Sequence, residues 1–118
     1  MSLSVYLYRT VKCPHCGGSV KTGEEVFWQN ITHNLGEMAE AAGIYKIVWR
    51  PEENGIITAG QMIEPLRAAI ADMKARPSYY ESFNAENGWG LYEHFLPWLI
   101  KYMEACVENS EAQVYASR

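Results

Sequence analysis

The hydrophobic period of this chain changes from two to about 3.6 and then back to two. Residues 4–10 and 25–30 alternate along the chain as strands with one buried face do. From residue 32 to about residue 106, apolar side chains recur three and four positions apart, as in amphipathic helices. Residues 113–117 alternate again and predict a strand that joins the hairpin made by the first two. The order β-β-α-α-α-β predicts an α+β fold, a small antiparallel sheet packed against about three helices.

The first helix is predicted from Thr32, and the side chain of either Thr32 or Asn30 can cap its first turn. The second, at residues 59–75, follows a capping box of Thr58 and Gln61 and contains Pro65, which predicts a kink or a break.

The third helix is predicted from residue 91, with a kink at Pro97. Residues 44–49 are predicted to be irregular or a short strand. Residues 78–90 combine turn residues with large rings, which is typical of a binding loop. The sheet face away from the helices carries Tyr and Trp, and we expect it to contact a second copy in a homodimer.

With 118 residues and 48% hydrophobic content, the chain suits a single domain over residues 1–118. A net charge of −4 argues against a nucleic acid partner, which clustered Lys and Arg would bind. No apolar run approaches the roughly 18 residues of a membrane span, and no export signal is evident. We therefore expect a soluble protein of the cytoplasm, the host's cytoplasm if a phage encodes it.

Four hydrogen-bonding side chains crowd the junction between the second strand and the first helix: Asn30, Thr32, His33 and Asn34. Helix capping accounts for one or two of them, and the surplus suggests a binding site. His33 suits a general base, but packing or capping explains it as well, and no triad-like spacing occurs.

The proposed second half of this site contains Asn84, Asn87 and Trp89, with Arg50 between the halves in sequence. Asn amides and aromatic rings suit a planar polar ligand, and Arg suits a phosphate or carboxylate. The alternative is structural, because the two Asn side chains can cap the third helix and Trp89 can fill the core.

Cys13 and Cys16 form a Cys-Pro-His-Cys-Gly-Gly turn that is half of a zinc ribbon site. A second Cys pair is missing, so zinc would need His15, His33, His94 or Cys106, or a second subunit. A metal-free turn is the simpler interpretation, and no cofactor other than zinc is suggested.

The chain resembles a small family of phage- and prophage-encoded proteins from about residue 26 to its end. The matching segments are residues 30–34 (NITHN), 49–53 (WRPEE), 83–90 (FNAENGWG) and 116–118 (ASR). The resemblance implies a phage or prophage origin and no mechanism. The hairpin tip varies in that family, which argues against a shared function of Cys13 and Cys16.

The sequence thus predicts a non-catalytic accessory protein that binds a small polar ligand, such as a nucleotide-like one, or a host protein. A zinc-stabilised module or metal-assisted enzyme centred on Cys13 and Cys16 is one alternative, and a virion or assembly component is another.

Overall fold

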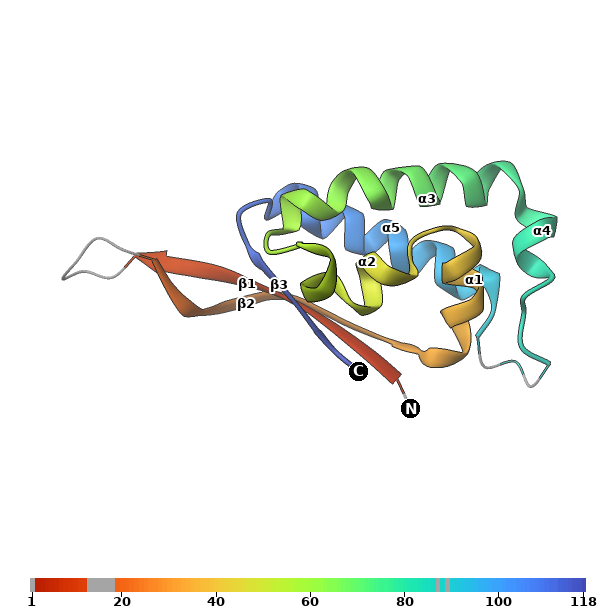
Figure 1. Cartoon of the computed structure of the whole chain (residues 1–118), viewed down its shortest axis with the longest axis horizontal. Coiled ribbons are helices and arrows are strands. Elements are labelled where there is room, and N and C mark those ends of the chain that lie inside the picture. Colours follow the sequence, from red (N-terminus) through yellow and green to blue (C-terminus); the bar gives the residue numbers. More distant parts are fainter. Residues whose placement is uncertain (1, 13–18, 87, 89) are drawn as a thin grey trace.

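The computed structural model of the chain describes residues 2–12, 19–86, 88 and 90–118 (Figure 1). Strands β1 (Ser2–Lys12) and β2 (Ser19–Thr32) form an antiparallel hairpin, and β3 (Gln113–Ser117) pairs antiparallel with β1. The strand order is therefore β2-β1-β3. This confirms the predicted α+β fold, with the N-terminal strand in the middle of the sheet.

The register explains why one face of the sheet is buried. Leu3, Val5 and Leu7 of β1 are fully buried on the helix side, whereas Tyr6 and Tyr8 face the other way. The register between β1 and β2 shifts after Leu7, so the predicted alternation of β2 fails at Val26 and Phe27, which both pack against the core.

The predicted first helix has two parts, η1 (His33–Leu35) and α1 (Gly36–Ala41). Gly43 follows with a positive φ of 74°, the left-handed conformation that ends many helices. Next comes α2 (Tyr45–Trp49), where an irregular segment or strand was predicted. That prediction was wrong because Ile44, Val48 and Trp49, at helical spacing, are all buried against the core, and tertiary packing outweighs their strand propensity.

The second predicted helix is confirmed but divided into η3 (Ala59–Met62) and α3 (Ile63–Ala75), after the short turn η2 (Pro51–Asn54). The Thr58–Gln61 capping box is present. Pro65 lies in the first turn of α3, where an N–H has no intrahelical partner, so it costs no hydrogen bond.

The predicted loop at residues 78–90 is partly helical, because α4 (Pro77–Glu81) starts at a proline suited to the first helical position. The third predicted helix is confirmed as α5 (Tyr92–Glu108), continuous through Pro97. The described part of the chain therefore has five α-helices rather than the three predicted, the short α2 and α4 being the additions.

Figure 1 shows the helices on one side of the sheet, the hairpin projecting past them, and the two chain ends close together. The α5 helix packs on the sheet, where Phe27 of β2 stacks on Tyr102 with ring centroids 5.8 Å apart. The α3 helix packs along α5. Gln29 Nε2 donates to the Trp98 carbonyl at 3.0 Å and fixes β2 to α5. Among the described helices, none has the length and apolar character needed to cross a membrane.

Candidate functional site

The junction between β2 and η1 is formed by a capped turn. Thr32 has extended backbone angles, and its hydroxyl accepts a hydrogen bond from the Asn34 N–H at 3.2 Å. The next residue, Leu35, is buried and anchors the turn to the core. Capping therefore explains Thr32, as the sequence predicted, and positions His33 and Asn34 at the end of the sheet.

His33 is fixed by a buried tryptophan. The indole Nε1 of Trp49 donates to His33 Nδ1 at 2.9 Å, and the Trp49 side chain is only 1% exposed. Because Nδ1 accepts this bond, a neutral His33 ring carries its proton on Nε2 and presents a donor there. The interaction satisfies the indole N–H inside the core, so His33 has the structural role that the sequence left open as an alternative.

The segment between α4 and α5 is closed by its own hydrogen bonds. The Ala85 N–H donates to the Gly90 carbonyl at 3.1 Å. Asn84 Oδ1 accepts from the Tyr92 N–H at 2.7 Å and so caps the start of α5. The capping role proposed for Asn84 is confirmed.

Gly90 joins this loop to the β2–η1 junction. It is buried, with φ at +120°, a conformation that L side chains rarely adopt. A Cβ built on Gly90 would lie 3.0 Å from Asn34 Cβ and 3.5 Å from Thr32 Cγ2. The absence of a side chain at this position therefore lets Gly90 approach Asn34, which lies 56 positions earlier in the sequence.

An open cleft with a volume of about 740 Å³ lies where they meet. Its described lining combines an imidazole, amides, a hydroxyl, an aromatic ring and two carboxylates: His33, Asn34, Glu37, Ser82, Phe83, Asn84, Ala85 and Glu86. The volume lies within the usual range for small-molecule sites, about 300–1,000 Å³. Glu37 and Glu86 are exposed, and no Lys or Arg occurs among these residues, so the cleft is acidic.

Two predicted site residues lie elsewhere. Asn30 does not line the cleft, and the two N–H groups of its amide are shared among the Ser2 and Ser4 hydroxyls, each 2.9 Å from Nδ2, and the Leu3 carbonyl at 3.1 Å, so it fastens β2 to β1. Arg50 is also absent from the described lining and pairs with Glu53 at 2.6 Å. The structure does not bring these two side chains to the cleft, because alternation along the strand and the local i,i+3 pairing direct them elsewhere, and a ligand-binding role for them stays a prediction.

The remaining predictions concern residues outside the described part of the structure. Asn87 and Trp89 belong to this group, and so do the zinc candidates Cys13 and Cys16. Within the described ranges, no three His, Cys, Asp or Glu side chains cluster as metal ligands. Cys106 is fully buried in the core, and burial raises the pKa of its thiol to about 12.

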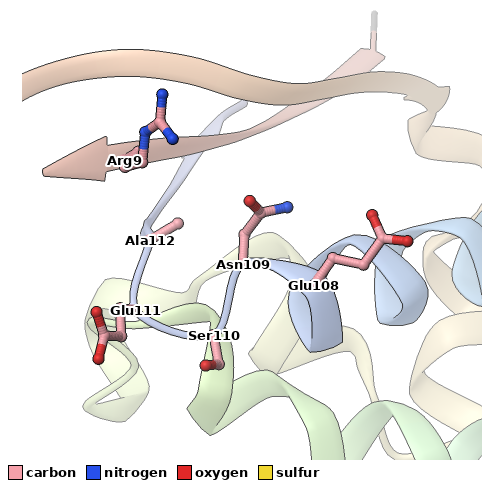
Figure 2. A pocket seen from close by; sticks show the side chains of 6 residues that line it. All are labelled: Arg9, Glu108, Asn109, Ser110, Glu111 and Ala112. Atoms are coloured by element: carbon pink, nitrogen blue, oxygen red, sulfur yellow. The ribbon is translucent and has the colours of Figure 1, made fainter.

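A second cleft, of about 420 Å³, lies between β1 and the corner that joins α5 to β3. Figure 2 shows that its polar side chains diverge: Arg9 points away from the corner, whereas Ser110 and Glu111 point to other sides of it. Side chains that do not converge provide no common binding position, so the acidic cleft is the better candidate.

Sequence reasoning missed Glu37, Ser82 and Glu86. Each is an exposed polar residue of a common type, and only the contact between the junction and the loop brings them together. The sequence signal that could have indicated this contact is Gly90, because glycine is the residue that permits a close backbone approach and a positive φ.

Comparison of the chain with known protein families, with curated proteins and with solved structures gives no match.

Proposed function

We propose that this protein is a non-catalytic binding protein that holds a small polar ligand in the acidic cleft. The observation that carries the proposal is the contact at Gly90, which brings His33 and Asn34 beside Asn84. The fixed neighbours of these residues, Trp49 and the α5 N-terminus, hold the cleft in place before any ligand arrives. The phage or prophage origin implied by the sequence resemblance, and with it an accessory role, remains a prediction.

The lining favours a ligand that donates hydrogen bonds or carries positive charge. Glu37 and Glu86 carboxylates accept hydrogen bonds only, and charge-assisted bonds to them are the strongest available there. Phe83 offers a ring to a planar group. A nucleoside base or an amine fits this chemistry, whereas the phosphate of a nucleotide has no cationic partner among the described lining residues.

Isothermal titration with a defined panel tests the proposal: adenosine, guanosine and cytidine, their monophosphates, cyclic nucleotides and spermidine. We expect heat from at least one uncharged or cationic member and weaker binding of the phosphorylated form of the same compound. No heat from any member would contradict the proposal.

The matched variants are Glu37→Gln and Glu40→Gln. Both carboxylates are exposed on α1, but only Glu37 lines the cleft. Loss of one charge-assisted hydrogen bond costs about 1.5–3 kcal/mol, so Glu37→Gln should weaken binding at least about tenfold and Glu40→Gln should leave it unchanged. Equal effects of the two variants would show that the cleft is not the site.

A further inference from the structure

One face of the sheet is not covered by any of the helices that the structure describes. Figure 1 shows all the helices on the opposite side. The register places Trp28 of β2, Tyr6 of β1 and Tyr115 of β3 in one row across the uncovered face. Trp28 is 54% exposed and Tyr115 is 56% exposed, unusually high values for rings of this size.

These rings form a continuous patch. The centroid of the Tyr6 ring lies 5.9 Å from that of Tyr8 and 5.8 Å from that of Tyr115. We call the surface made by Tyr6, Tyr8, Trp28 and Tyr115 the aromatic face. Burying apolar surface lowers the free energy by about 25 cal/mol for each Å² removed from water. A partner that covers these exposed rings would therefore be stabilised by their burial.

The aromatic face carries little charge. Its neighbours by register are Ser4, Asn30, Ser117 and Gln113, all uncharged, and the one charged residue paired with it in the described register is Glu25, opposite Tyr8. The whole chain has a net charge of −4, so two copies repel each other over most orientations. A nearly neutral face is the part of the molecule on which a second copy meets the least repulsion.

The hairpin supplies a second reason for a partner. The β1–β3 pairing ends at Tyr8 and Gln113, but the β1–β2 pairing continues to Lys12 and Ser19, so the outer hairpin has two strands only. It projects beyond the helical layer (Figure 1). A two-stranded ribbon is marginally stable alone in water, and packing against another sheet would support it.

From these observations we infer that the aromatic face is a homodimer interface, in which two sheets pack face to face to give a four-layer particle. Sheets stack about 10 Å apart with their side chains interdigitated, which buries both sets of rings. The three-stranded part is only about 14 Å wide and about 17 Å long at standard strand spacings. An area of that size belongs to the weak class of specific interfaces, so we expect a dissociation constant in the micromolar range.

Sedimentation equilibrium of the full chain from about 1 to 500 µM tests the inference. The wild-type protein should change from monomer to dimer within that range, because micromolar affinity places the midpoint there. A protein that stays monomeric at the highest concentration would overturn the inference, even if the face then bound a different macromolecule.

Matched charge substitutions locate the interface. Tyr115→Glu brings like charges close together in a two-fold dimer and should weaken association at least tenfold, and Trp28→Glu should do the same. Val107→Glu is the control, because Val107 of α5 is 55% exposed, as Tyr115 is, but lies in the helical layer. Circular dichroism of each variant is the control that checks whether it is folded. If Val107→Glu weakens the dimer as much as the sheet variants do, the aromatic face is not the interface.

Discussion

Gly90 is the residue on which the geometry of the acidic cleft depends most. Its φ of +120° is strained for any other residue, and a Cβ there would lie 3.0 Å from Asn34 Cβ. Gly90→Ala should therefore lower the free energy of unfolding by about 1–3 kcal/mol and weaken binding of any ligand that the panel identifies.

Gly88→Ala is the control for that substitution in urea unfolding experiments. Gly88 also has a positive φ, 78°, but nothing lies within 4 Å of a Cβ placed on it. It should lose less stability than Gly90→Ala, since only the backbone strain applies. Equal losses would mean that the close approach to Asn34 contributes nothing.

Tyr102 offers a gain in stability. Its hydroxyl is buried with no hydrogen-bond partner among the described residues, and burial raises its pKa. Tyr102→Phe removes this unpaired group and keeps the ring that stacks on Phe27. We expect about 1 kcal/mol of added stability in urea unfolding.

Tyr92→Phe is the matched comparison, because the Tyr92 hydroxyl donates to the Met73 carbonyl at 2.8 Å. That variant should lose about 1 kcal/mol. A comparable loss in Tyr102→Phe would reveal a buried partner, such as a water molecule, for the Tyr102 hydroxyl.

The corner between α3 and α4 contributes a pH-dependent part of the free energy of unfolding. The Arg76 guanidinium and then the Tyr80 hydroxyl donate to Asp72, and these hydrogen bonds lower the pKa of its carboxyl group. Tyr80 is fully buried, so this contact fixes α4 to the end of α3. Because the folded pKa lies below the unfolded one, Asp72 stabilises the protein above a pH of about 3.9, and this contribution disappears as pH falls through the lower folded pKa.

Asp72→Asn should accordingly be less stable than the wild type at pH 7, with the difference shrinking below about pH 4. Urea unfolding at pH 7, 5 and 3 measures this. Glu64→Gln, which removes the exposed pair with Arg67 on the same helix, should change stability little at each pH. If the difference in free energy of unfolding between Asp72→Asn and the wild type is the same at pH 3 as at pH 7, the ionised carboxylate is not its cause.

At the scale of the molecule, the two ends of the chain stabilise each other. Val5 of β1 pairs with Ala116 of β3, and the Arg118 guanidinium donates to the Trp49 carbonyl at 2.8 Å and to Glu52 at 2.6 Å. The sheet therefore forms only when the first and last segments meet around the helices, which makes the fold depend on long-range contacts.

We expect a single cooperative unfolding transition, as the predicted single domain over residues 1–118 implies. Far-UV circular dichroism and tryptophan fluorescence should give coincident urea curves, because Trp49 and Trp98 are buried in the same core that the helices build. Two separated transitions would show that the hairpin and the helical layer unfold independently.

The periodicity of the sequence determined the three strands, the three principal helices and the buried face of β1, because residue spacing alone decides which side chains share a face. Local chemistry likewise indicated the Thr32 and Thr58 caps, whereas it left a cap by Asn84 as one of two alternatives.

Only the tertiary structure decided the strand order, the helical state of residues 45–49 and the membership of the cleft. Each of these depends on contacts between segments far apart in sequence. The entropy lost in closing the chain between such segments, and the free energy that their contacts contribute, cannot be derived from a local sequence pattern. Asn30 and Asn34 illustrate this, since they lie only four positions apart and yet one fastens two strands while the other lines the cleft.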